Sequence, residues 1–455
     1  MPPLSALDRP GPSIRVGSRR WFLEVGLGGL GLGGLGGLAL LPQSPSGLAA
    51  QEVRPQPTPR RKSLILFWLS GGPSHIDMWD PKPDAPQEIR GPYGVIPTRI
   101  PGVQFCEHLP LQASIADKLT VIRSVDCRAS NHTPITMQAG NPLARRTDDG
   151  RDGGGYPSMG SVVARYHGPN HPSLPPFVGL ADSWVSDVWE AGDMGSQYAP
   201  VKGSELAGKF GLPGGIALPQ LQDRAQLRQS LDRWGRQIDN DRQLERLDRY
   251  TRQAYEMVLS GRVQQAFDVS QETAATRAAY GEDSLGQKAL LARRLVEAGV
   301  SFVLVSGAWG YFDHHGDNVR WGGIVKGLTP LLPTIDRTLH ALITDLESRG
   351  QLDDTLILML GEFGRSPVIN KDAGRDHWTN VMSMLVAGGG WRHGQVIGAT
   401  DSRGGDIQSN PVRPQDLAAT VYRYFGIDLG ASWTNSRGRP IPLVTEGGRP
   451  IPELS

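Results

Sequence analysis

Short apolar runs without a polar face constrain the fold of this chain more than any other feature. They are SLILFWLSGG at 63–72, FVLVS at 302–306, TLILML at 355–360 and VMSMLVAGGG at 381–390. A strand that is apolar throughout is covered on both faces, as in a parallel sheet. Segments with helical spacing and a closing glycine precede the second and third runs. The sequence therefore predicts an α/β fold with a central, mostly parallel sheet.

Polar side chains follow these strands, at the points where the strands end. In an open parallel sheet, residues just past the carboxyl ends of the strands line the ligand crevice. The candidates after the first run are Ser74, His75 and Asp77; after the second they are Asp313, His314, His315, Asp317 and Asn318; after the third they are Glu362, Arg365, Arg375, Asp376 and His377. We expect these three loops to meet.

Imidazole and carboxylate groups together can ligate zinc, whereas oxygen-rich sites favour calcium, magnesium or manganese. Because alternate residues of an extended loop face the same way, Asp313 and His315 form a better pair than consecutive residues. The alternative for residues 313–317 is a solvated turn. For His377 it is a side chain that holds its loop by backbone hydrogen bonds, and for Glu362 it is an ion pair with Arg365. The sequence favours a divalent metal ion, of zinc, calcium or magnesium type, on Asp313, His315 and His377, with Glu362 and with His75 or Asp77 as further ligands.

The N-terminus carries Arg19 and Arg20 before a weakly hydrophobic Gly/Leu stretch. This pattern resembles a twin-arginine export signal, and a retained membrane anchor is the alternative. We expect a signal peptide at 1–50 and a Pro/Arg-rich linker at 51–62. No later stretch has the roughly twenty apolar residues of a membrane helix. The mature protein is expected to be periplasmic or extracellular, exported by the twin-arginine translocase, with no stable membrane span after signal removal.

Charge is balanced, because 47 Lys+Arg face 46 Asp+Glu, and this gives no reason to expect nucleic acid as a partner. Residues 141–215 are rich in Gly, Pro and Asp and are predicted to be long loops. Residues from about 221 to 280 are densely charged with apolar positions at helical spacing, which predicts a helical insertion. Cys106 and Cys127 are expected to be buried thiols, with one disulfide as the alternative.

Four segments carry a resemblance to a known family: LILFWLSGGPSHIDMWDPKP, the stretch from YGEDSLGQK to YFDHHGDN, LGEFGRSP, and GRDHWTNVMSMLVAGGGWRHGQVIGATD. On these, the chain is identified as a member of the exported proteins grouped as domain of unknown function 1501. That family is similar to the alkaline phosphatase and sulfatase superfamily, which implies an α/β sandwich over 63–448 with a metal-centred site. By this resemblance His377, Asp313 and His315 stand where metal ligands stand. Ser130 stands where the nucleophile would be, with a helix N-cap as the alternative.

The chain also departs from the superfamily pattern. Relatives place an aspartate directly after the first strand, where this chain has Ser70. They place Asp-His after a later strand, where this chain has Glu362 and Phe363. Formylglycine sulfatases need a proline and an arginine where this chain has His132 and Pro134. The resemblance therefore argues against a formylglycine sulfatase.

Two functions follow from these observations. The first is an exported metal-dependent hydrolase of a small-molecule or polysaccharide anionic ester, phosphate in preference to sulfate. The metal would lower the pKa of water or of the Ser130 hydroxyl, and Arg365 or Arg375 would hold the anion in a bidentate fork. The alternative is a non-catalytic binding or structural protein on a degenerate sulfatase-like fold, which the serine at position 70 and the missing histidine favour.

Overall fold

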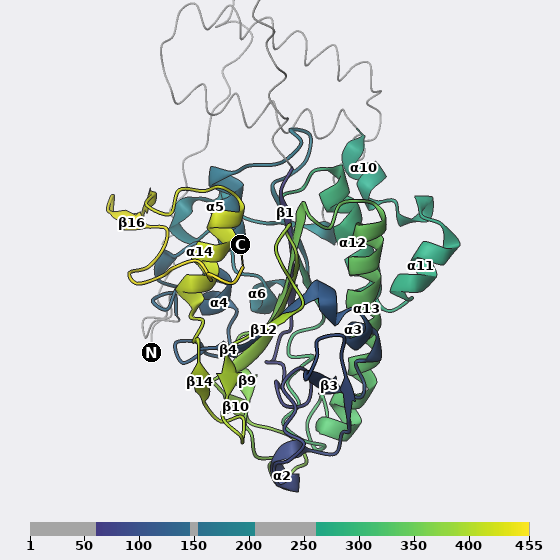
Figure 1. The fold of residues 1–455 in the computed structure, drawn as a ribbon. Coiled ribbons are helices and arrows are strands. Elements are labelled where there is room, and N and C mark those ends of the chain that lie inside the picture. The colour runs from purple at the N-terminus through teal and green to yellow at the C-terminus, as the bar shows by residue number, and fades with distance from the viewer. Residues whose placement is uncertain (1–60, 146–152, 205–260, 455) are drawn as a thin grey trace, which may run out of the picture. The chain divides into compact units, whose positions relative to one another are not determined.

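An eight-stranded sheet is the centre of the computed structural model, which describes residues 61–145, 153–204 and 261–454 (Figure 1). Its strand order is β12-β4-β11-β8-β1-β7-β5-β6. In that order the strands are Gln395–Ile397, Leu119–Val125, Met382–Gly388, Thr355–Leu360, Ser63–Trp68, Phe302–Ser306, Phe177–Leu180 and Val201–Lys202. The expected signal peptide, most of the expected linker and residues 221–260 of the expected insertion lie outside the described residues.

Only one of these eight strands runs against the others. β8, β1, β7, β5 and β6 pair in parallel, as do β4 and β12. β11 pairs antiparallel with both β4 and β8. The α/β fold class with a mostly parallel sheet is therefore confirmed, and the direction of β11 is the feature that an apolar strand pattern does not disclose.

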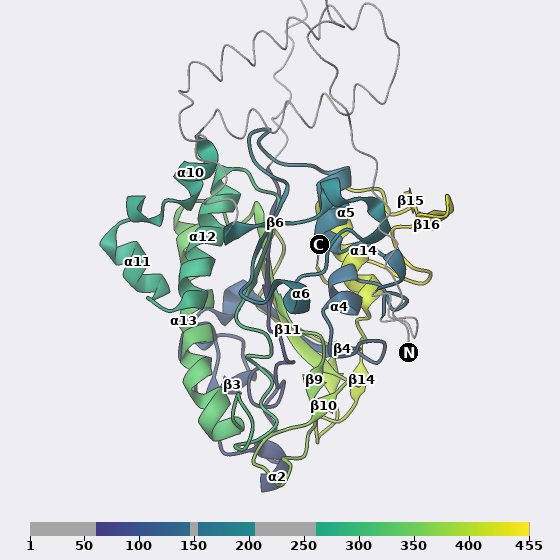
Figure 2. The same cartoon turned by 180° about the vertical axis from the view of Figure 1, so that it is seen from behind.

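Both faces of the sheet are covered, which explains its apolar strands. Along β1, Ile65 and Phe67 pack into one hydrophobic cluster, whereas Leu64, Leu66 and Trp68 pack into another. Helices α12 (Ser284–Ala298) and α13 (Thr329–Ser348) belong to the first cluster, and α5 (Met159–Tyr166) and α14 (Pro414–Tyr424) to the second. Figures 1 and 2 show these helix pairs on opposite sides of the sheet.

Local sequence signals set the ends of α12. The Asp283 side chain accepts a hydrogen bond from the backbone N–H of Gly286 and so caps the first turn. At the other end, Gly299 adopts φ of 121°, a conformation that glycine tolerates. The chain then enters β7, as the alternation of helix and strand predicts.

Shorter elements complete the described fold. The remaining α-helices are α2 (Gln87–Arg90), α3 (Pro110–Ser114), α4 (Ile135–Ala139), α6 (Trp184–Asp187), α10 (Arg262–Phe267) and α11 (Ala274–Tyr280). Two-stranded sheets pair β2 (Val95–Pro97) with β3 (Gln104–Cys106), β9 (Gly364–Arg365) with β10 (His377–Trp378), β13 (Ala399–Thr400) with β14 (Ile407–Ser409), and β15 (Ser432–Thr434) with β16 (Pro440–Pro442). Single turns of 3₁₀ or π-helix are η1 (Ala116–Lys118), η2 (Gly153–Gly155), η3 (Gly192–Met194), η4 (Ser196–Tyr198), η5 (Val269–Gln271) and η6 (Ile324–Leu328).

The Gly/Pro/Asp-rich region holds more regular structure than its composition predicts. It supplies α5 and two strands of the main sheet, β5 and β6, so the expectation of long loops over 141–215 was wrong for these segments. Cys106 and Cys127 are buried free thiols. Among the helices of the described ranges, none combines the length and the apolar character that crossing a membrane requires.

Candidate metal centre

Three side chains from distant parts of the chain converge beyond the ends of the strands. One ligand atom each of His132, Asp313 and His377 lies within 4.8 Å of the other two. His132 follows β4, Asp313 follows β7 and His377 begins β10. Two imidazoles and a carboxylate form a donor set that suits zinc and related divalent ions.

His315 contacts two members of this group. Its Nε2 lies 2.9 Å from Nε2 of His377 and 3.1 Å from Oδ1 of Asp313. Nε2 of His377 lies 3.0 Å from the same oxygen. On a tetrahedral zinc ion with bonds of about 2.0 to 2.1 Å, neighbouring ligand atoms are about 3.3 Å apart. The three atoms lie slightly closer together than this, at hydrogen-bonding distances, and would move apart to share a cation.

Neighbouring charges shift the titration of the group. Burial by itself would raise the pKa of Asp313, but hydrogen bonds with His132 and His377 and the charge of Arg365 hold it well below its ordinary value. Burial by itself would lower the pKa of His132, but the carboxylates of Asp313 and Glu362 outweigh it and raise that pKa to about 9. Burial lowers the pKa of His377, against the effect of Asp313. A proton on His132 therefore competes with a metal ion below pH of about 9.

The loop that carries Asp313 is fixed to the end of β1. The backbone N–H of Phe312 donates to the Ser70 carbonyl at 2.8 Å, and that of Gly310 donates to the Ser70 hydroxyl oxygen at 3.0 Å. Gly71 has φ of 105°, and a Cβ there would lie 2.5 Å from the backbone nitrogen of Asp313. Only glycine permits this approach, so the double glycine after the first strand positions a candidate ligand.

Glu362 lies beside the group. Its side chain is buried, and Oε1 accepts hydrogen bonds from the backbone N–H of Gly71 at 2.8 Å and from Nδ1 of His132 at 2.9 Å. Oε2 of the same carboxylate has no hydrogen-bond partner among the described residues. Glu362 thus touches the candidate ligand set through His132.

The structure does not bring His75 and Asp77 to this group. Asp77 forms a buried ion pair with Arg375, with its two oxygens 2.7 and 2.9 Å from Nε and Nη2. His75 is buried, and its Nε2 lies 2.8 Å from the Gly404 carbonyl oxygen. In the structure these two side chains join loops to one another.

The two arginines expected to clamp an anion have protein partners at all three guanidinium nitrogens. Arg365 donates to Asp313 and to the carbonyls of Gly71, Gly72, Phe312 and Arg375. Arg375 donates to Asp77 and to the carbonyls of Ile89, Ser366 and Pro367. Both side chains are buried. Their contacts hold the loops of the site together.

The two serines that the resemblance singles out, Ser70 and Ser130, are both buried. Ser130 is buried, and its hydroxyl has no hydrogen-bond partner within the described ranges. It does not cap α4, because the N-cap residue of that helix is Pro134. Ser70 donates a 2.6 Å hydrogen bond to Oδ1 of Asp187, whose pKa is raised to about 7 by burial.

His132 and Asp187 are the residues of this region that sequence reasoning did not select. His132 stands in the segment SNHTPIT, where the resemblance draws attention to the serine. A histidine two residues from a candidate nucleophile, after a buried strand, was the available signal. Asp187 lies in α6, inside a region predicted to be loops, and the sequence offers no comparable signal for it.

A pocket of about 320 Å³ opens next to the candidate metal centre. The ring of His132 lines it and stacks on Trp309, with the ring centroids 5.1 Å apart. The other lining residues are Thr133, Pro134, Ile135, Val185, Ser186 and Trp189. Two indoles and two hydroxyl side chains give the pocket both apolar and polar surface.

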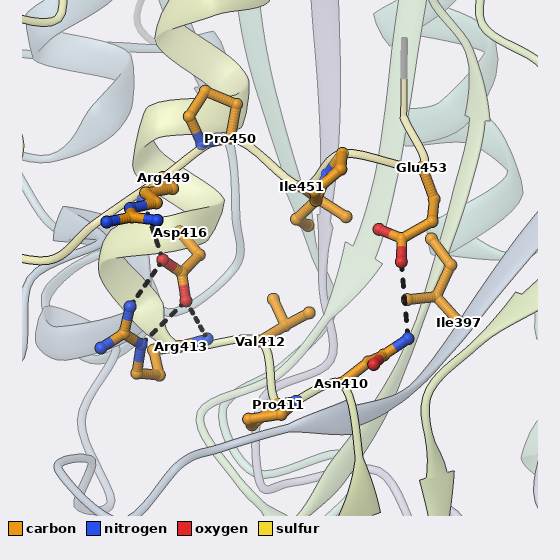
Figure 3. Close-up of a pocket in the computed structure, with 11 residues that line it drawn as sticks. Ile397, Asn410, Pro411, Val412, Arg413, Asp416, Arg449, Pro450, Ile451 and Glu453 are labelled. Atoms are coloured by element: carbon orange, nitrogen blue, oxygen red, sulfur yellow. Dashed lines mark hydrogen bonds and ion pairs between the residues drawn. The ribbon is translucent and has the colours of Figure 1, made fainter.

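A second pocket, of about 280 Å³, lies between the N-terminal end of α14, β12 and residues 449–453 (Figure 3). Its polar side chains bond to one another. Asp416 accepts from Arg413 and from the backbone N–H of Arg449, and Asn410 donates to Glu453. None of the residues that line it belongs to the group of His132, Asp313 and His377.

A family model described as "Protein of unknown function (DUF1501)" matches residues 61–455. The chain belongs to this family. The match covers the whole α/β domain, including His132 and the strand-end residues, and confirms the family that the four sequence segments indicate. No curated protein matches the chain.

Several solved structures are similar to this family member. Ps i-CgsB in complex with k-i-k-neocarrahexaose has 13% identity and a TM-score of 0.40, covering 81% of this chain and 73% of that one. The PsFucS1 sulfatase from Pseudoalteromonas sp. has 12% identity and a TM-score of 0.35, covering 81% and 68%. The phosphonate monoester hydrolase of Agrobacterium radiobacter has 10% identity and a TM-score of 0.39, covering 87% and 77%.

Proposed function

We propose that this chain is a metal-dependent hydrolase of an anionic ester, a phosphate ester in preference to a sulfate ester. The observation that supports the proposal is the convergence of His132, Asp313 and His377, with His315 in contact, beside a pocket large enough for an organic group. These side chains would hold one divalent ion. When bound, that ion supplies Lewis-acid polarisation of the ester and a more acidic water.

The chain's own residues would divide the remaining tasks. Asp313 provides a permanent negative charge, because its pKa lies well below the ordinary value. The pocket beside His132 would receive the organic part of the ester, with Trp189 and Trp309 packing on a ring and Thr133 and Ser186 bonding to its polar groups. The hydroxyl of Ser130, buried and without a partner in the described chain, is the candidate nucleophile, and water is the other.

The preference for phosphate comes from the segment around Ser130. Conversion to formylglycine would need a proline at position 132, where this chain has a histidine that faces Asp313 at 3.5 Å. Residue 132 thus contributes an imidazole to the proposed metal site. We also propose that the protein acts outside the inner membrane, as the twin arginine at 19–20 suggests.

A second candidate function is a binding protein without catalysis. It is favoured by Ser70, which stands in the place of a metal-ligating aspartate and bonds to Asp187. It is also favoured by Arg365, whose guanidinium already contacts Asp313 and leaves no nitrogen without a protein partner. A site of this kind would hold one cation and bind an anion without turning it over.

Metal content and ester turnover separate the two functions. Purified protein is analysed for bound metal and then assayed on a panel of aryl phosphates and aryl sulfates, beside His377→Ala. As a control, His340→Ala replaces a half-buried histidine of α13. We expect one metal ion and phosphate hydrolysis in wild type and in the control, and loss of both in the variant. Protein without stoichiometric metal, with turnover equal in wild type and His377→Ala, contradicts the hydrolase; retained metal without turnover supports the binding protein.

A further inference from the structure

We propose that Glu362 acts on the metal centre through His132, as a positioning residue and not as a ligand. Its carboxylate accepts the Nδ1–H of His132 and so leaves Nε2 of that ring as the ligand atom. The inference rests on the proposed metal-dependent function and assigns a role to a residue that the sequence suggests as a ligand.

The two nitrogens of His132 lie between two carboxylates. Nδ1 is 2.9 Å from Oε1 of Glu362, and Nε2 is 3.5 Å from Oδ2 of Asp313. A neutral imidazole has one N–H and one lone pair, and the partner of one nitrogen decides which it carries. With the N–H at Nδ1 held by Glu362, the lone pair is at Nε2, on the side of Asp313.

Ring contacts hold the plane of His132 in place. The imidazole stacks on Trp309 at 5.1 Å and contacts Phe363 at 5.5 Å and His377 at 4.7 Å between ring centroids. These contacts orient the plane but do not distinguish Nδ1 from Nε2. The Glu362 carboxylate makes that distinction, which is how carboxylates that accept from metal-bound histidines act.

Glu362 is itself fixed for this role. It lies two residues after the end of β8, the residue is 2% exposed, and its Oε1 accepts from the backbone N–H of Gly71 at 2.8 Å. The oxygen that accepts the hydrogen bond from Nδ1 of His132 is therefore also bonded to the backbone just after β1. The other oxygen, Oε2, lacks a partner in the described residues and is the atom that would bind the metal if Glu362 were a ligand. The test must separate these two roles.

The experiment compares zinc binding to the full-length protein with Glu362→Gln and Glu362→Leu. Glutamine keeps an oxygen that can accept from Nδ1–H of His132 but is a poor metal ligand. Leucine can neither accept that hydrogen bond nor bind a metal ion. A positioning role predicts zinc affinity within about tenfold of wild type for Gln and a loss of about 10 to 100-fold for Leu, with one zinc per chain in all three. Equal losses for Gln and Leu would show a direct ligand and overturn the inference, as would Leu binding zinc like wild type.

Two spectroscopic measurements keep the inference testable if the leucine variant fails to fold. In zinc-loaded protein labelled with ¹⁵N-histidine, we expect a proton on Nδ1 of His132 and none on Nε2; the reverse pattern contradicts the proposal. The visible absorption of the Co²⁺-substituted Gln variant should match that of wild type, because no ligand is lost. A changed Co²⁺ spectrum would place Glu362 on the metal.

The outcomes for the function and for this inference are distinct. Wild type that binds zinc but hydrolyses no ester overturns the hydrolase. The zinc affinities of the Glu362 variants and the two spectra then still decide the positioning role. Wild type that hydrolyses esters while all Glu362 variants bind zinc equally overturns the positioning role alone. Wild type that binds no divalent metal overturns both.

Discussion

The hydroxyl of Ser70 donates a 2.6 Å hydrogen bond to Oδ1 of Asp187, and the hydroxyl of Ser306 lies 3.3 Å from Oδ2. Ser70 and Ser306 lie at the ends of neighbouring strands, β1 and β7, and Asp187 ends α6. Burial favours the protonated form of this carboxyl, whereas the two hydroxyl donors favour its ionised form, and burial outweighs them. This relationship gives the first prediction.

Asp187→Asn should change how stability depends on pH. Burial raises the pKa of Asp187 from 3.8 to about 7, so the folded state binds the proton more tightly than the unfolded state. The protonated Asp187 therefore contributes to the free energy of unfolding at low pH. This contribution, about 4 kcal/mol, is lost as pH rises from about 4 to about 7. The difference in unfolding free energy, variant minus wild type, should therefore increase by about that amount between pH 4 and pH 8.

Urea unfolding across this pH range measures the difference. Asp428→Asn, which removes an exposed carboxylate, is the matched control and should give a flat difference. A flat difference for Asp187→Asn as well would show that Asp187 ionises normally in the folded protein.

Asp77→Ala should destabilise the fold and leave metal binding intact. It removes the partner of a buried arginine, Arg375, and an uncompensated buried charge costs about 3 to 5 kcal/mol. The double variant Asp77→Leu/Arg375→Met removes both charges and should be less destabilised than Asp77→Ala. Denaturant unfolding and metal analysis check this. If Asp77→Ala kept its stability and lost its metal, Asp77 would be a ligand, as the sequence suggests.

Metal affinity should rise with pH up to about 9. Without metal the pKa of His132 is raised to about 9, so binding through Nε2 must displace a proton at lower pH. Apparent zinc affinity should increase by about tenfold per pH unit from pH 6 to pH 8, for one proton released. Calorimetry in buffers of different ionisation enthalpy counts the protons. An affinity that stays constant over this range would exclude His132 as a ligand that is protonated in the free protein.

Trp309→Ala should weaken substrate binding more than turnover. Its ring lines the pocket and stacks on His132, and aromatic contacts of this kind contribute about 0.5 to 1.5 kcal/mol. We expect KM for an aryl phosphate to rise roughly 2 to 10-fold, with metal stoichiometry unchanged. Trp391→Ala, which removes an indole packed on Tyr424, is the control and should leave KM unchanged. An unaltered KM in Trp309→Ala would remove the pocket from the substrate path.

Much of the fold could be predicted because burial leaves a direct mark on sequence. The runs at 63–72, 302–306 and 355–360 are apolar on both faces, and they became β1, β7 and β8. Strand direction leaves no such mark, so the antiparallel course of β11 had to come from the structure. Gly179 of β5 shows the other difficulty, since a short strand in a Gly-rich region has no periodicity to read.

The site was predictable where it followed the ends of strands and not where it depended on pairing. Residues just past the carboxyl ends of parallel strands line one crevice, and this rule places Asp313, His315 and His377 in loops that meet. It does not say that Asp77 pairs with Arg375, because those residues are 298 positions apart and no local pattern links them. His132 was missed because the resemblance draws attention to Ser130, two residues before it.

Arg365 joins the stretches of chain on which the candidate metal centre depends. Its side chain binds the carbonyls of Gly71, Phe312 and Arg375, which arrive from three separate stretches of the chain. His132, Asp313 and His377 also lie in separate stretches of the chain, so this group of three forms only where those stretches dock, whereas Asp313 and His315 are two positions apart. A cation that needs all three side chains would therefore bind the folded chain in preference to the unfolded one.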